Sequence, residues 1–176
     1  MISWEREKFF LFPGVHSLVF NVGDKVVYPM HGAGIIEAIE EKEVLGKKQT
    51  YYVMHLPIGE MKVMIPTGSV GCVGLREVIP ENEVFKVFEV LRSKKSKMSS
   101  NWNRRYRANL EKIKSGDIYE VAEVVRNLVL RDREKGLSTG ERKMLDNARQ
   151  ILISELVLAK GIRADQASHI LDEVFA

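Results

Sequence analysis

The residues best suited to chemistry in this sequence are an aromatic ring and its neighbouring cations, in SSNWNRRYRANLEKIKSG (residues 99–116). Trp102 is followed closely by three arginines, Arg104, Arg105 and Arg107. Arginines hold phosphates, and an exposed ring can stack on bases or wedge between them. These residue types therefore favour non-covalent binding to nucleic acid.

The position of Trp102 allows two interpretations. Trp102, Tyr106, Leu110 and Ile113 form one apolar helical stripe, and tryptophan is highly buried on average, which favours a core residue. The ring also lies in the first turn after a polar, basic segment, and the arginines fall mostly off the stripe, which favours an exposed ring. The residues alone leave both interpretations open.

Charge is distributed unevenly along the 176 residues. Residues 1–92 carry 10 basic and 12 acidic side chains, whereas residues 93–176 carry 17 basic and 12 acidic ones. Between residues 94 and 114, eight Lys and Arg residues accompany a single acidic residue, Glu111. This asymmetry points to a polyanionic partner for the second half, although a solvated basic surface would give the same pattern.

Catalytic and metal-binding patterns are missing from the sequence. The histidines and the single cysteine, Cys72, show no metal-ligand spacing, and no nucleophile-elbow motif occurs. The GAGIIE segment (residues 32–37) lacks the third glycine of a dinucleotide-binding motif and leads into strand-like residues, which indicates a tight backbone approach instead. We therefore expect no enzyme, no cofactor, no metal and no membrane span, and a cytoplasmic protein.

Hydrophobic periodicity divides the chain into two halves. Strand-forming residues alternate with Gly-containing turns in four segments, at 24–32, 34–44, 50–56 and 60–66, and residues 73–79 could add one more short strand. Four or five such strands indicate a small antiparallel barrel. The second half has helical periodicity in segments from about residue 82 to the end of the chain. Two capping boxes are expected at helix starts, Asp117 with Glu120 and Ser138 with Glu141. The predicted fold class is α+β, with an antiparallel barrel followed by an all-α bundle.

Four stretches closely resemble the CarD (CarD/CdnL) family of bacterial transcription regulators. They are VGDKVVYPMHGAGIIEAIE, MKVMIP, NWNRRYRANLEKIKSGDIYEVAEVVRNL and RDREKGLSTGERKMLDNARQILISELVLA. The resemblance covers about residues 20–176, and its barrel motif is shared with transcription-repair coupling factors. It implies a Tudor-like domain at 20–79 that docks on the RNA polymerase β subunit, and a helical DNA-binding domain at 80–176.

The resemblance also implies specific DNA contacts. In this family a tryptophan wedges into the minor groove at the upstream edge of the transcription bubble, and Trp102 occupies its place in the motif. Arg104, Arg105 and Arg107 match basic positions of the same motif, and Arg142, with Lys143 beside it, matches another. The expected partner is promoter DNA, contacted largely without regard to sequence, by a monomeric protein that stabilises the open complex.

The polymerase-binding strand implied by the resemblance is residues 62–66, Lys62, Val63, Met64, Ile65 and Pro66, with Lys42 as a further contact. The family often has an arginine where this chain has Met64, and Lys62 lies on the same expected face.

Two further expectations complete the interpretation. Residues 1–18 have no counterpart in the family pattern, which begins near Phe20. Residues 1–19 are therefore expected to be an extension that is disordered or results from a start placed too early, with Val19 as the true initiator. The alternative function is a polymerase-tethered adaptor, in which the helical domain binds a protein and its basic surface is only solvated.

Overall fold

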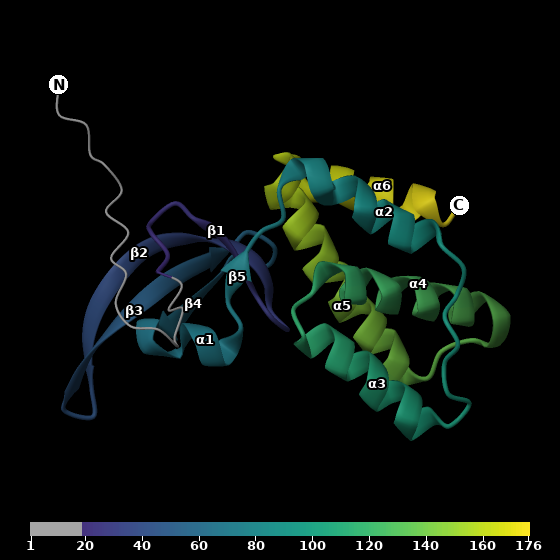
Figure 1. Ribbon diagram of the computed structural model, residues 1–176, viewed down its shortest axis with the longest axis horizontal. Helices are drawn as coiled ribbons and strands as arrows, with labels where there is room; N and C mark the ends of the chain where they lie inside the picture. The colour runs from purple at the N-terminus through teal and green to yellow at the C-terminus, as the bar shows by residue number, and fades with distance from the viewer. Residues whose placement is uncertain (1–18) are drawn as a thin grey trace, which may run out of the picture.

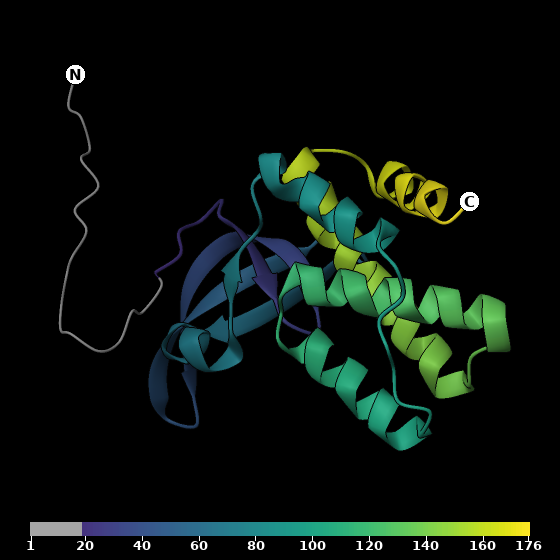
Figure 2. The same ribbon diagram turned by 45° about the vertical axis from the view of Figure 1, so that its right-hand side comes forward.

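The structure is a computed structural model that describes residues 19–176. Our expectation for the N-terminal extension falls, apart from Val19, on residues outside that range. In Figures 1 and 2 a curved sheet lies to one side and the helices to the other, with α2 and α6 side by side and α3 at the opposite edge of the bundle. The predicted fold class, a Tudor-like antiparallel sheet domain followed by a helical domain, is confirmed.

The N-terminal half is one antiparallel sheet with strand order β4-β3-β2-β1-β5. Its strands are β1 (Lys25–Tyr28), β2 (Gly32–Val44), β3 (Lys47–Leu56), β4 (Met61–Pro66) and β5 (Arg76–Glu77). The β2–β3 register shifts between Ile36 and Ala38, and such an irregularity increases the local bend and twist. One face buries a core that includes Val26, Ile36 and Met54. Short helical turns η1 (Thr67–Ser69) and α1 (Val70–Val73) follow β4.

The C-terminal half consists of helices around a second core. After the turn η2 (Glu81–Glu83) they are α2 (Val84–Arg92), α3 (Trp102–Lys114), α4 (Ile118–Lys135), α5 (Thr139–Lys160) and α6 (Ala164–Val174). The Ser138–Glu141 capping box at the start of α5 is confirmed. Asp117 caps α4 as predicted, but its side chain accepts from Tyr119 N and the structure shows no reciprocal bond from Glu120.

Polar contacts fix the sheet against the helices. The Arg76 guanidinium holds the buried Glu155 carboxylate through two hydrogen bonds of 2.6 and 2.7 Å, and the Ile79 N–H donates to the same group over 3.1 Å. Ala33 N donates to Ser154 Oγ over 2.8 Å. Bidentate arginine–carboxylate pairs are geometrically specific. The two halves are therefore held in one relative orientation.

The predicted close backbone approach in the GAGIIE segment is also confirmed. Gly32 has φ +107°, and a Cβ there would lie 2.7 Å from Ser154 Oγ on α5. A Cβ on Gly34 would lie 2.3 Å from the carbonyl oxygen of His55 on β3. The glycines allow strand β2 to touch both its neighbour and α5, which is a packing role.

Candidate nucleic-acid interface and docking strand

Trp102 is the first residue of α3, at the edge of the bundle. Asn101 caps the helix by accepting a hydrogen bond from Arg104 N over 3.1 Å, which fixes where the helix starts. The tryptophan is 43% exposed, and its ring stacks on Tyr106 one turn later, with centroids 5.1 Å apart and planes 23° from parallel. The structure thus decides between the two interpretations left open by the sequence, because the ring lies outside the buried core.

The indole also contacts the start of α5. Its Nε1 donates a hydrogen bond to Ser138 Oγ over 2.9 Å. A Cβ on Gly140 would lie 3.5 Å from Cζ2 of the indole, so the ring edge lies against the first turn of α5. The tryptophan is therefore half-exposed but held on two sides, by Tyr106 and by α5.

Arg105 is a correction to the predicted DNA contacts. It is 3% exposed, and its Nε donates to Oε1 of the buried Glu141 over 2.6 Å. Its Nη1 donates to the carbonyl oxygens of Ser99 and Ser100. A guanidinium with these partners is part of the fold and is not presented to phosphates, so its assignment as a DNA contact is wrong for this structure.

Glu141 is the centre of this buried network. Burial alone would raise its pKa, but hydrogen bonds from Arg105 and from the backbone and side chain of Ser138 outweigh that effect and hold the pKa below its ordinary value. Arg131 Nε lies 3.5 Å from Oε1 and adds a second cation. The carboxylate is therefore kept charged inside the bundle.

The other predicted DNA residues are exposed. Arg104 and Arg107 lie on the outer side of α3, and Lys143 lies in the first turns of α5, near the helix start that holds the indole. Within residues 19–176 these three cations take part in no ion pair. Arg142 is exposed as well but pairs with Asp132 over 3.2 Å, which neutralises part of its charge.

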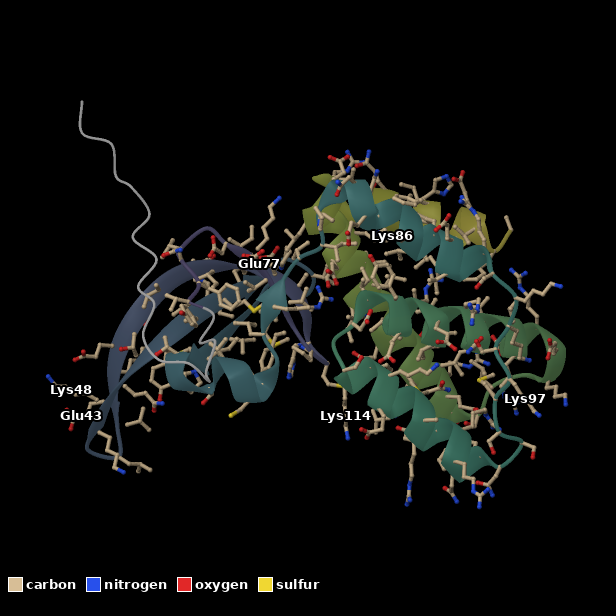
Figure 3. The ribbon with its side chains drawn as sticks, viewed as in Figure 1. Glu43, Lys48, Glu77, Lys86, Lys97 and Lys114 are labelled. Atoms are coloured by element: carbon tan, nitrogen blue, oxygen red, sulfur yellow. The ribbon has the colours of Figure 1, made fainter. Side chains whose placement is uncertain are left out.

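Other cations near α3 also fall into two groups, those in ion pairs and those without an ion-pair partner. Lys112 pairs with Glu123 over 2.7 Å and Lys114 pairs with Glu111 over 3.2 Å. Lys97, in the segment before α3, forms no ion pair within the described residues. Figure 3 shows Lys97 and Lys114 well apart on the helical half. On α3 and in the segment just before it, the cations without an ion-pair partner in residues 19–176 therefore lie toward the start of the helix.

The predicted docking strand is β4, at the edge of the sheet. Met64 is exposed and Val63 and Pro66 are half-buried, but Ile65 is 1% exposed and belongs to the sheet core. The side chain of Ile65 is therefore a wrong assignment as a polymerase contact, because it packs in the sheet core. An edge strand does present backbone groups to a partner.

Charged side chains on β2, β3 and β4 pair with one another. Lys62 Nζ lies 2.7 Å from Glu37, and that hydrogen bond lowers the pKa of Glu37 below its ordinary value. Lys42 Nζ lies 3.3 Å from both Glu40 and Met64 Sδ. His55 lies between Glu37 and Glu60. This set, Glu37, Glu40, Lys42, His55, Glu60 and Lys62, is called the charge-paired face below.

Two other kinds of site are absent from the described part of the chain. Residues 19–176 contain no group of His, Cys, Asp and Glu side chains arranged to hold a metal ion. No helix in this range has the length and apolarity needed to cross a membrane.

Comparison with known proteins agrees with both halves. Residues 20–79 match the family described as "CarD-like/TRCF RID domain", and residues 86–172 match "CarD, C-terminal domain". The Bacillus subtilis (strain 168) protein named "Putative transcription factor YdeB" is 48% identical over 148 residues, which are 84% of this chain and 97% of that protein. A solution structure of the 72-residue N-terminal domain of Myxococcus xanthus CarD is 39% identical to this chain, with a TM-score of 0.31. The matched region covers 39% of this chain and 92% of that domain.

These matches, in the same order as the two structural halves, define a two-domain transcription regulator. The chain belongs to the CarD family.

Sequence reasoning missed the bond between Trp102 and Ser138. The capping box showed that the Ser138 hydroxyl lies at a helix start, but nothing local showed which other helix end lies beside it. Glu141 was also seen only as a capping residue, and its pairing with Arg105, 36 residues away along the chain, has no local signature.

Proposed function

We propose that this transcription regulator binds RNA polymerase at the β subunit through the sheet domain, and contacts promoter DNA at the upstream edge of the bubble. There Trp102 wedges into the minor groove and stabilises the open complex. The observation that carries the proposal is the exposed ring, held between the starts of α3 and α5. The same two helices carry Arg104, Arg107 and Lys143, which form no ion pair within residues 19–176.

The energetics of the wedge are sufficient for regulation. Opening a base step costs a few kcal/mol, and stacking a base on an aromatic side chain contributes about 1–3 kcal/mol. Since about 1.4 kcal/mol corresponds to a tenfold change, the ring alone can shift the opening equilibrium by about five- to 150-fold. Neighbouring cations add sequence-independent attraction to phosphates.

The contact between the halves supports a division of labour. Edge strand β4 offers backbone groups and the exposed Met64 to a protein surface. The Arg76–Glu155 pair fixes the orientation of the sheet relative to the helices. Docking through the sheet would therefore also place the start of α3, and Trp102 needs little affinity of its own for DNA.

The test compares wild type with Trp102→Ala. We expect polymerase capture to be unchanged and the lifetime of heparin-challenged open complexes to fall by about five- to 150-fold. Because the ring is half-exposed, the lost stacking and hydrogen bond should reduce the free energy of unfolding by about 1–2 kcal/mol, against about 3–5 for a core tryptophan. An unchanged lifetime in a folded variant would contradict the wedge.

A second candidate is the adaptor, in which the helical half binds a protein. A shallow groove between α2 and α6 favours it, because Phe85 is 57% exposed there and Phe88 and Ile170 line the same groove. Salt dependence separates the two functions. DNA binding should weaken steeply as salt rises, in proportion to the phosphates neutralised, whereas an apolar protein contact should change little.

A further inference from the structure

The hydroxyl group of Ser138 has three polar partners. It donates to Glu141 Oε2 over 3.0 Å and accepts from Glu141 N over 3.2 Å and from Trp102 Nε1 over 2.9 Å. A hydroxyl has one donor and two acceptor positions. These three bonds therefore use its full capacity, and the cap of α5 and the indole share one oxygen atom.

The Glu141 carboxylate that binds this oxygen is itself held by further hydrogen bonds. Glu141 Oε2 also accepts from Ser138 N over 3.1 Å, while Oε1 accepts from Arg105 Nε over 2.6 Å. Arg105 in turn donates to the carbonyl oxygens of Ser99 and Ser100, just before Trp102. The start of α3 and the start of α5 are thus joined twice, once through the buried ion pair and once through the indole.

The same contacts define which part of the ring faces outward. Nε1 and Cζ2 lie on one edge of the indole, and that edge faces Ser138 and Gly140. Tyr106 covers one face of the ring. What remains for a partner is the opposite edge, which contains only carbon, and the other face, which offers no hydrogen-bond donor because the indole N–H lies in the plane of the ring.

We propose that Ser138 is a positioning residue for Trp102: its hydroxyl holds the indole in the orientation that wedges, and withdraws the indole N–H from base contacts. This inference rests on the proposed function and deepens it. A ring whose N–H is already bonded to Ser138 stacks on any base, because it offers no hydrogen-bond donor with which to select one. The chemistry of the partner is therefore an unstacked base step of any sequence.

Substitutions at Ser138 can separate the capping role from the positioning role. Glycine is a good N-cap residue and costs only a few tenths of a kcal/mol relative to serine, whereas alanine costs about 1 kcal/mol. Ser138→Gly therefore removes the bond to the indole and largely spares α5. Ser138→Thr keeps the hydroxyl and serves as the conservative control.

The decisive experiment is a double-mutant cycle on open-complex lifetime between Ser138→Gly and Trp102→Phe, whose ring has no N–H. In the protein with Trp102, Ser138→Gly frees the indole side chain and should shorten the lifetime by about two- to tenfold. Ser138→Thr keeps the hydroxyl, so its lifetime should stay close to that of the wild type. In the Trp102→Phe background Ser138→Gly should have no further effect. Equal factors in both backgrounds would show that Ser138 acts only on the fold, and would overturn the inference.

A second measurement reports on the ring itself. In a Trp4→Phe background, Trp102 is the single tryptophan. Ser138→Gly should speed the local decay of its fluorescence anisotropy and increase quenching by acrylamide, with a melting temperature close to that of the parent protein. Unchanged decay and quenching would overturn the inference. If Trp102→Ala shortens the lifetime but Ser138→Gly does not, the proposed function stands and only the positioning role fails.

Discussion

The charge-paired face of the sheet and the start of α3 use charge in opposite ways. On the sheet, Lys62 and Lys42 each have a carboxylate within 3.3 Å. At the start of α3, Arg104 and Arg107 have no ion-pair partner within the described residues. Glu43 and Lys48, labelled at the far end of the β2–β3 hairpin in Figure 3, show that both signs continue along the sheet.

The difference indicates what kind of partner each surface suits. A surface of mixed, mutually paired charges is close to neutral, and selects a protein partner by the arrangement of its charges. A surface of unpaired cations attracts any polyanion, with little regard to sequence. The two halves of one chain therefore match two chemically different partners.

The largest effect is expected for Arg105, within α3 itself. Arg105→Ala leaves Glu141 buried without its main partner, and breaking a buried pair costs about 3–5 kcal/mol of unfolding free energy. Arg107→Ala, on the exposed side of the same helix, should change it by no more than about 0.5 kcal/mol. Urea denaturation of both variants measures the contrast.

Arg105→Met/Glu141→Leu is the matched control for the buried pair. Replacing both charges by apolar groups removes the uncompensated buried carboxylate, so part of the lost stability should return. The capping bonds of Glu141 and its pairing with Arg131 are lost in this variant and should keep the recovery incomplete. If Arg105→Ala were as stable as Arg107→Ala, the buried network would not hold the start of α3.

The second effect concerns the salt dependence of DNA binding. Arg104→Ala and Arg107→Ala should each lower the slope of log affinity against log salt by about 0.9, which corresponds to one phosphate. Arg142→Ala should lower it less, because Asp132 already neutralises part of its charge. Binding to a promoter fragment, measured over a salt series, gives the three slopes. Slopes equal to that of the wild type would exclude these side chains as phosphate contacts.

The third effect tests the charge-paired face. The swap Glu37→Lys/Lys62→Glu keeps the intramolecular pair and reverses its direction, so the free energy of unfolding should change by less than about 1 kcal/mol. Polymerase capture should weaken, because the pattern presented to the partner is inverted. The salt slope for DNA should stay unchanged, and an altered slope would show that the two surfaces are not independent.

Sequence patterns predicted the order of the domains, the strands and the capping box, because these depend on local periodicity and short-range hydrogen bonds. They misplaced the inner face of α3. Of the predicted stripe only Ile113 is fully buried, while Tyr106 and Leu110 are half-buried and Trp102 is exposed. The other fully buried side chains of α3 are Arg105 and Asn109. A buried arginine is favourable only with a buried carboxylate opposite, and Glu141 reaches that place through the packing of α5, which no local pattern encodes.

The smallest effect is the pH dependence of stability, where the two regions differ again. The pKa of Glu141 is lowered in the folded protein, so its contribution to stability is present above the ordinary value of 4.5 and is lost as the pH falls through the lower folded value. The pKa of Glu37 is lowered too, but its partner Lys62 is exposed and salt screens that pair.

Glu141→Gln should therefore make the free energy of unfolding fall less steeply as the pH is lowered. The change in slope should correspond to less than about one bound proton, and it should be the same at low and high salt. Glu37→Gln should make the fall less steep at low salt alone, and urea denaturation between pH 3 and pH 6 (roughly the range of carboxylate titration) measures both. A salt-sensitive effect at Glu141 would mean that water reaches its carboxylate. The Arg105–Glu141 pair next to Trp102 would then behave like the exposed pairs on the sheet.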